Sequence, residues 1–397
     1  MTTAVIVDAV RTASGRGKAG GGLAPVHPAT LLADVLAEVV RRNDLDPALV
    51  DDVIGGCVTQ SGEQAGNISR TAVLAAGFPE SVPATTVDRQ CGSSQQAAHF
   101  AAQGVLAGAY DIAIACGVES MSHAPLFSNA QGADPVNVPI RHRYPQGLVP
   151  QGIAAEIITQ RWKLRREELD EFAARSHQRA AAAAAAGGFG DEIVGIDTVD
   201  AAGRPHRHLV DETVRAATTA EGLAALRPAF ANEEMAQRFP EIDWSITPGN
   251  SSPLTDAASA VLIMSEDKAN ALGLRPRARF HSFAVTGDDP LLMLTAVIPA
   301  TRKALERGGL TIDDLDVYEV NEAFAPVPLV WQHDLNADPA KLNPRGGAIA
   351  LGHALGASGT RIMATMLNHL EQTGGRYGLM TMCEAGGLAN ATIIERL

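Results

Sequence analysis

Hydrophobic and polar positions follow two alternating periods along the first 120 residues, which predicts strands and helices in turn. Short β-branched runs, "AVIVDAV" (Ala4–Val10) and "YDIAIACG" (Tyr110–Gly117), are typical of buried strands. Between them, "HPATLLADVLAEVVRRNDL" (His27–Leu45) repeats its apolar residues at helical spacing. Strands that alternate with helices in this way indicate an α/β fold.

The C-terminal part of the chain repeats this order, which indicates an internal duplication at an offset of about 270 residues. "LAEVVRRNDLDPALVDDVIGG" (Leu36–Gly56) and "TRKALERGGLTIDDLDVYEVN" (Thr301–Asn321) each read as a helix with a basic end, a turn, an acidic stretch and a strand. Two later strands end in Cys116 and Cys383 at corresponding places. We expect the two halves to pack together, with a site where strand ends meet.

The duplicated halves are separated by a segment of different composition, rich in Pro, His and Arg, which we interpret as an inserted domain. It contains an alanine run that predicts a helix stopped by Gly187 and Gly188. The predicted division is an N-terminal half at 1–120 completed by about 245–268, an insertion at 121–244, and a C-terminal half at 269–397.

Composition narrows the class of protein. The 397 residues are 46% hydrophobic and only 4% aromatic, which suits helices and sheets packed closely through small side chains. A net charge of −13 argues against nucleic acid as a partner. No apolar run is long enough to span a membrane, and the first residues do not resemble a signal peptide. Four cysteines without a C-x-x-C pair predict no metal site and a cytoplasmic location with reduced thiols.

Two motifs are weak evidence for a binding site. "GRGKAG" (Gly15–Gly20) matches a dinucleotide-binding loop, but the next helix begins near His27–Pro28 rather than at the third glycine, so a flexible loop is the better interpretation. "HRH" (His206–His208) has no further metal-ligand candidates nearby in sequence, and we interpret it as an exposed polar loop.

Cys91 is the strongest candidate for chemistry. It lies in "VDRQCGSSQQA" (Val87–Ala97), just ahead of a predicted helix, where unpaired N–H groups and the helix dipole favour the nucleophilic thiolate. A small buried hydrophobic residue is the ordinary role of a lone cysteine, but the small polar neighbours suit a reachable turn.

Three further candidates come from the C-terminal half. His353 lies in the glycine-rich "GGAIALGHALGASGTR" (Gly346–Arg361) and is a candidate base. Asn321 and Cys383 each follow or end a predicted strand. The duplication would bring these residues to the same strand and helix ends as Cys91, and the convergence of two thiols, an imidazole and an amide indicates a catalytic site.

These motifs together resemble the thiolase family over essentially the whole chain. The resemblance is carried by "VDRQCGSSQQA", "GVESMS", "TPGNSSPLTDAASA", "NEAFA", "NPRGGAIALGHALGASGTR" and "CEAGG", in that order. It implies a duplicated five-layered α-β-α-β-α core with an inserted loop domain that binds coenzyme A. It also implies thiolytic cleavage of 3-ketoacyl-CoA, as in fatty-acid β-oxidation, or the reverse Claisen condensation.

The resemblance also implies roles for individual residues. Cys91 would carry the acyl group, His353 would activate it, and Cys383 would move the proton at the α-carbon. Asn321 would hold a water in one oxyanion hole, and the N–H groups of Cys91 and Ala385 would form another. No metal or resident cofactor is implied, coenzyme A being a substrate, and a homodimer or homotetramer is expected. The expected CoA-contacting positions are Arg215, Phe230, Ser252, Ala323 and Phe324.

The sequence departs from the family pattern after both catalytic motifs. Ala354 replaces a usual proline, which would loosen the turn after His353, and Ala385 replaces a usual glycine. Glu384 adjoins Cys383, but alternation along a strand predicts that it faces away from the thiol.

Four other functions share part of this pattern. Pro150 and Gln151 stand where biosynthetic acetoacetyl-CoA thiolases usually carry His-Met, which favours a broader 3-ketoacyl-CoA thiolase over that alternative. Cys383 argues against a decarboxylating ketoacyl synthase. A cysteine hydrolase and a non-catalytic acyl-CoA binding protein complete the set.

Overall fold

A computed structural model describes residues 2–397. Nine strands form the main path of one large sheet, and β2 and β6 add to β9 and β1. The strands of the path are β1 (Ala4–Thr12), β3 (Asp52–Gly56), β4 (Ala84–Val87), β5 (Ile112–Ser120), β9 (Thr255–Ser265), β10 (Ala278–Gly287), β11 (Val317–Val320), β12 (Tyr377–Glu384) and β13 (Leu388–Arg396). The short strands are β2 (Gly15–Arg16), β6 (Ile193–Val194), and the separate hairpin β7 (Ile196–Val199) and β8 (Pro205–His208).

The helices of the two halves are distinct from those of the inserted segment. The halves contain α1 (Pro28–Arg42), α2 (Ile68–Ala75), α3 (Ser93–Leu106), α9 (Glu266–Ala271), α10 (Val297–Gly308), α11 (Pro326–Leu335), α12 (Ala348–Leu351) and α13 (Ser358–Thr373). Between β5 and β9 lie α4 (Val138–Arg143), α5 (Gln151–Arg161), α6 (Arg166–Ala185), α7 (Ala220–Ala224) and α8 (Glu233–Arg238). Short 3-10 turns are η1 (Pro47–Leu49), η2 (Gly62–Gln64), η3 (Ser128–Ala130), η4 (Ile312–Asp314) and η5 (Leu355–Ala357).

The strand order shows the duplication directly. It runs β11-β12-β13-β10-β1-β9-β5-β3-β4, so the two halves meet where β1 pairs with β10. Going outward, β1 pairs antiparallel with β9 as β10 does with β13. Next, β9 pairs antiparallel with β5 as β13 does with β12, and then β5 runs parallel to β3 as β12 does to β11. The repeat inferred from the sequence is therefore an architectural repeat.

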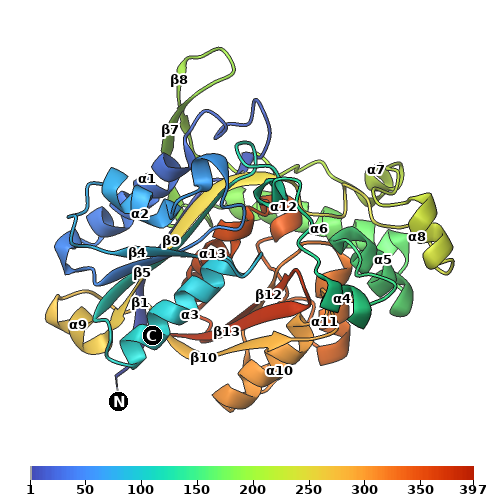
Figure 1. Ribbon diagram of the computed structural model, residues 1–397. Coiled ribbons are helices and arrows are strands. Elements are labelled where there is room, and N and C mark those ends of the chain that lie inside the picture. The colour runs from blue at the N-terminus through green and yellow to red at the C-terminus, as the bar shows by residue number, and fades with distance from the viewer. Residues whose placement is uncertain (1) are drawn as a thin grey trace.

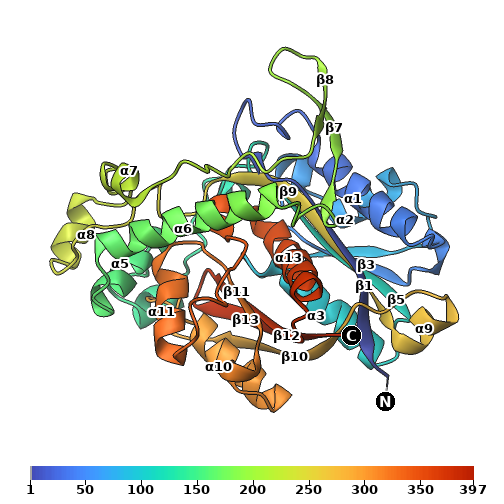
Figure 2. The same cartoon turned by 180° about the vertical axis from the view of Figure 1, so that it is seen from behind.

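Three layers of helices alternate with the two halves of the sheet, which gives five layers. Helices α1 and α2 cover the outer face of the first half, and α10 and α11 cover the outer face of the second. Helices α3 and α13 lie between the two halves (Figure 1, Figure 2). The expected five-layered thiolase core is confirmed. Alanines such as Ala97, Ala98 and Ala101 line α3, and their small size lets sheets and helices approach closely.

The segment between β5 and β9 lies mostly beside the second half. Helices α5 to α8 gather next to α11, whereas the β7–β8 hairpin stands out from the other side of the molecule (Figure 1). The alanine run forms the end of α6, which stops at Gly187 with φ of 74°, as predicted. His206 is exposed, but His208 is buried, so "HRH" is a strand and not the exposed loop expected. No helix within residues 2–397 is both long and apolar enough to cross a membrane.

Candidate active site

Cys91 lies in a strained turn between β4 and α3. The preceding Gln90 has φ of 49°, a left-handed conformation that is costly for a residue with a side chain. The Asp88 carboxylate accepts a hydrogen bond from the Gln90 N–H at 2.6 Å. The Ser93 hydroxyl accepts from the Arg89 N–H at 2.9 Å and donates to the Gln90 carbonyl at 2.6 Å. These bonds on both sides hold Cys91 at the amino end of α3.

Glycines bring the amino ends of α3 and α13 together. The Thr360 N–H of α13 donates to Ser94 Oγ of α3 at 3.1 Å. A Cβ at Gly359 would lie 2.2 Å from the Gln95 nitrogen, and one at Gly356 would lie 2.7 Å from the Gly56 carbonyl oxygen. No side chain fits in either place. The glycines around His353 therefore allow the two helices, one from each half, to converge on one point.

His353 is buried and held through both backbone and ring. Its N–H donates to Thr255 Oγ1 at 3.0 Å, and its Nδ1 lies 2.7 Å from Ser358 Oγ. Ser358 donates its single hydrogen to the Ala354 carbonyl at 2.8 Å, so its oxygen accepts from Nδ1. This assigns the proton to Nδ1 and leaves Nε2 able to receive one.

The electrostatic surroundings keep this imidazole neutral. Burial lowers the pKa of His353 to about 3, and the nearby Arg361 charge acts in the same direction. A neutral imidazole with an unprotonated Nε2 is the form that a general base requires.

Replacing Ser358 by alanine tests this tautomer. Loss of one hydrogen bond to the ring is expected to reduce turnover about tenfold and to alter the pH–rate profile. Thr373→Ala is the matched control, because Thr373 at the other end of α13 donates to the backbone carbonyl of His369 at 2.7 Å, as Ser358 does to that of Ala354. Steady-state rates across pH provide the measurement; equal rates for both variants would show that Ser358 does not govern the base.

Asn321 lies directly beside the histidine. It follows β11, its N–H donates to the Thr381 carbonyl of β12 at 3.0 Å, and its Nδ2 lies 3.4 Å from His353 Nε2. Its Oδ1 is buried without a hydrogen-bond partner among residues 2–397. The structure thus brings two of the sequence-predicted residues into contact and leaves an amide oxygen available to a further donor.

Both thiols of the proposed site have a pKa above the ordinary value for cysteine. Burial raises the pKa of the Cys91 thiol well above its ordinary value, and the charges of Cys383 and Glu384 add to the rise. Burial likewise raises the pKa of Cys383 to about 12, with Glu384 adding to it. The expectation that the helix end would favour a thiolate at Cys91 is wrong for the resting protein, because the loss of water around the buried thiol outweighs the helix dipole.

The direction predicted for Glu384, away from the Cys383 thiol, brings it close to the Cys91 turn. Its carboxyl lies against the amino end of α3, so close that a Cβ at Gly92 would be 1.8 Å from Oε1. Alternation along β12 does point it to the opposite face of the strand from Cys383, but that face is the one that α3 covers. Glu384 therefore follows Cys383 along the chain but lies next to the Cys91 turn in space.

The two alanine substitutions fit the backbone. Ala354 has φ of −72°, which lies in the range that proline would impose, and its turn is held by the bond from Ser358. Ala385 is not among the residues with positive φ; those positions fall on Gly386 and Gly387. Neither alanine strains the site.

Four of the five expected CoA-contacting residues lie together. Phe230 and Phe324 pack edge to face with ring centroids 5.9 Å apart, and the Ser252 N–H donates to the Ala323 carbonyl at 3.0 Å. Ala323 and Phe324 belong to the same apolar cluster as Cys383. Arg215 is separate and exposed, and its N–H donates to His177 Nδ1 at 3.2 Å.

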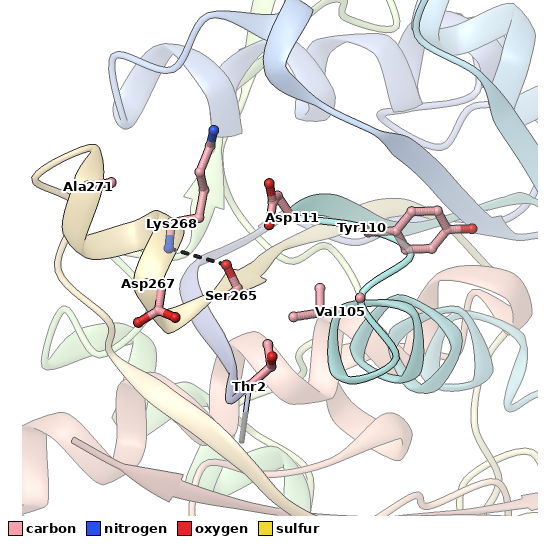
Figure 3. A pocket seen from close by; sticks show the side chains of 9 residues that line it. Thr2, Val105, Tyr110, Asp111, Ser265, Asp267, Lys268 and Ala271 are labelled. Carbon is pink, nitrogen blue, oxygen red and sulfur yellow. Dashed lines mark hydrogen bonds between the residues drawn. The ribbon is translucent and has the colours of Figure 1, made fainter.

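A surface hollow at the other end of α3 does not belong to this site. Figure 3 shows its lining, which includes Val105, Tyr110 and Lys268. It lies at the carboxyl end of a 14-residue helix, whose length is about 21 Å at 1.5 Å per residue. None of the predicted site residues lines it. Within residues 2–397 no group of His, Cys, Asp and Glu side chains is arranged as a metal site.

Comparison with known proteins agrees with this architecture. The thiolase N-terminal domain family matches residues 4–267, and the thiolase C-terminal domain family matches residues 274–396. A steroid 3-ketoacyl-CoA thiolase of Mycobacterium tuberculosis is 48% identical over 405 residues, covering 100% of this chain and 95% of that protein. A 3-ketoacyl-CoA thiolase of Shewanella baltica is 46% identical over 401 residues, with 100% of both chains covered.

Among solved structures, an acetyl-CoA acetyltransferase of Bacillus anthracis superposes with a TM-score of 0.89 at 38% identity, covering 100% of this chain and 99% of that one. The chain belongs to the thiolase family. It is an acyltransferase.

Sequence reasoning missed three residues that position the site. Ser358 and Thr255 hold His353, and Gly92 makes room for Glu384. Ser358 lies five residues after His353 within the same motif, so its closeness in sequence could have identified it as a partner of the histidine. Thr255 is 98 residues away from His353 along the chain, and no local pattern connects them.

Proposed function

We propose that this protein is a 3-ketoacyl-CoA thiolase that uses Cys91 as nucleophile, His353 as base and Cys383 as the acid at the α-carbon. The observation that supports the proposal is the contact between the amino ends of α3, which follows Cys91, and α13, which follows the loop of His353. His353 in turn contacts Asn321. The relatives that are 44% to 48% identical are all named 3-ketoacyl-CoA thiolases.

The first step forms the acyl-enzyme. Because the Cys91 thiol is protonated at rest, His353 Nε2 takes its proton as sulfur attacks the 3-keto carbon. The resulting oxyanion receives hydrogen bonds, for which the N–H groups of Cys91 and Ala385 are the proposed donors, each typically worth about 3 kcal/mol of barrier. The C2–C3 bond then breaks, and its electrons pass to the acetyl-CoA enolate. Water held by Asn321, with His353, is proposed to stabilise the enolate oxygen.

The remaining steps return all protons. Cys383 donates its proton to C2 of the enolate, and acetyl-CoA leaves. Free CoA then attacks the acyl group on Cys91 while its thiol proton passes to the Cys383 thiolate. Collapse of this intermediate expels the Cys91 sulfur, which recovers its proton from the imidazolium. The high pKa of Cys383, about 12, suits a group that holds a proton until a carbanion-like centre takes it.

Turnover of a 3-ketoacyl-CoA with free CoA tests the proposal. We expect loss of the ketoester and formation of acetyl-CoA plus a shortened acyl-CoA only when CoA is present, followed by absorbance and by mass spectrometry of products. CoA-independent release of a free acid would instead identify a hydrolase. Tight binding without any turnover would identify an acyl-CoA binding protein, and either result contradicts the proposal.

The degradative assignment is favoured over the biosynthetic alternative. An acetyl-CoA acetyltransferase shares the fold, but at 38% identity it is less similar than the 3-ketoacyl-CoA thiolases. Pro150 and Gln151 begin α5, and the next residue, Gly152, packs against the Phe230 ring, where a Cβ would lie 2.3 Å away. The residues that differ from biosynthetic thiolases therefore adjoin a proposed pantetheine-contacting phenylalanine. A series of acyl chain lengths would define the preferred substrate.

The expected CoA and subunit contacts complete the proposal. The insertion at 121–244, with Arg215 and Phe230, would bind CoA, and Ser252, Ala323 and Phe324 would line the way to Cys383. A homodimer or homotetramer in the cytoplasm is proposed. In support, β4 is the terminal strand of the sheet path, its residues are partly exposed, and it leads directly into the Cys91 turn. A second copy on this edge would cover an unpaired strand.

A further inference from the structure

Glu384 is a buried acid that follows Cys383 along the chain and contacts the Cys91 turn, and the proposed mechanism leaves it without a role. Its exposed fraction is 0%. It follows Cys383 at the end of β12, and its carboxyl occupies the space that the missing side chain of Gly92 leaves at the amino end of α3. Three atoms of Glu384, Oε1, Cδ and Cγ, are the nearest neighbours of that position. Gly92 therefore allows a carboxyl group to reach the helix end that also carries Cys91.

The two oxygens of this carboxyl have different surroundings. With the Asn390 amide oriented toward Glu384, its nitrogen donates to Oε1 at 3.2 Å and its oxygen accepts from the Gln96 N–H at 3.3 Å. The other oxygen, Oε2, is buried and has no hydrogen-bond partner among residues 2–397. An ionised carboxylate left this way is strongly disfavoured, whereas a protonated acid needs fewer hydrogen-bond donors around it.

The charged groups around Glu384 and Cys91 come from three elements. Arg89 and Asp88 of the preceding turn act on Glu384, and Glu384 and Cys383 of β12 together with Glu119 of β5 act on Cys91. Burial raises the pKa of Glu384 well above its ordinary value, with Asp88 adding to the rise and Arg89 opposing it. This environment favours the neutral carboxyl, and its ionisation and that of Cys91 oppose one another.

We propose that Glu384 is a positioning residue that acts through Cys91. The neutral acid packs against the amino end of α3, so that this helix end remains available to stabilise the thiolate that develops at Cys91. The ionised carboxylate instead suppresses formation of the nucleophile. The inference rests on the proposed role of Cys91. It adds a proton-dependent control of the nucleophile by a residue outside the reacting set.

Alkylation of Cys91 by iodoacetamide, followed by mass spectrometry across pH, tests the proposal without requiring carbon–carbon cleavage. Glutamine reproduces the neutral acid, so Glu384→Gln and the wild type are expected to react within about twofold of each other near pH 7. As pH rises and Glu384 ionises, the wild type should fall behind the variant by about tenfold, which corresponds to one unit of thiol pKa. The profile of kcat/KM for thiolysis should show the same divergence. Glu306→Gln, an exposed change on α10, is the control and should follow the wild type.

Two results would overturn the proposal. Alkylation of Glu384→Gln that is already tenfold faster near pH 7 would mean that the carboxyl is charged at rest. Superimposable profiles at all pH values would mean that Glu384 does not act on Cys91. If the site chemistry behaves as expected but no 3-ketoacyl-CoA is cleaved, the proposed function fails while this inference stands.

A second variant keeps the test informative if Glu384→Gln does not fold. Arg89 opposes the neutral form of Glu384, so Arg89→Gln should move the loss of wild-type reactivity to higher pH. A shift to lower pH in the single variant, or no shift, would contradict the proposal, and circular dichroism establishes that each variant is folded.

Discussion

Cys383→Ala is expected to abolish thiolytic cleavage, by about 10³-fold, while Cys91 still accepts an acyl group. Conversion of the acetyl-CoA enolate into acetyl-CoA needs a proton donor at C2, and loss of the Cys383 thiol removes it. Exchange of labelled CoA into acyl-CoA needs only Cys91 and His353 and should persist. The measurement is the ratio of CoA exchange to thiolysis in the same preparation. Full thiolysis by the variant would exclude Cys383 from the mechanism.

The duplication supplies the control for this experiment. Cys116 lies within β5, the strand of the first half that corresponds to β12. Like Cys383, it is a buried thiol whose pKa burial raises to about 12. Cys116→Ala removes the same atoms from the other half and should leave both reactions intact. A comparable loss in the two variants would point to a packing effect rather than to proton transfer.

His353→Asn is expected to reduce both thiolysis and CoA exchange, by 10²- to 10⁴-fold. Because burial keeps the Cys91 thiol protonated, no nucleophile forms unless a base accepts the proton as attack proceeds. Asparagine retains a polar side chain but not a basic nitrogen. Parallel losses in both reactions, in contrast to the selective loss in Cys383→Ala, would separate activation of the nucleophile from protonation of the enolate.

His333→Asn is the matched control, since His333 is exposed on α11. It should leave both rates unchanged. If His353→Asn retained normal CoA exchange, Cys91 would not depend on His353, and the base would have to be sought elsewhere.

The architecture could be predicted from the sequence because its signals are local and repeated. The helix of residues 27–45 and the strands around Val7 and Ile114 follow their hydrophobic periods, and the duplicated order fixes how they pair. His353 and Asn321 could be placed together because each follows an element with a counterpart in the other half, and they are indeed in contact.

The protonation states could not be predicted in the same way. A helix terminus near Cys91 suggests a thiolate, but the balance depends on how much water is excluded and on which charges face the sulfur. Glu384 shows the difficulty: strand alternation gives the correct face of β12, yet only the packing of α3 on that face shows that Cys91 is there. Thr255 is a similar case, since its bond to His353 joins segments 98 residues apart.

The convergence of α3 and α13 has a consequence for how the duplicated unit was used. The two helices are equivalent by the symmetry of the sheet, but one begins at a sulfur and the other at an imidazole-bearing loop. The two duplicated halves carry different residues at equivalent positions. They therefore form one site with complementary parts instead of two identical sites. Either copy produced alone would be chemically incomplete, and a chain cut in the loop between β9 and β10 would regain its chemistry only if the pieces reassembled.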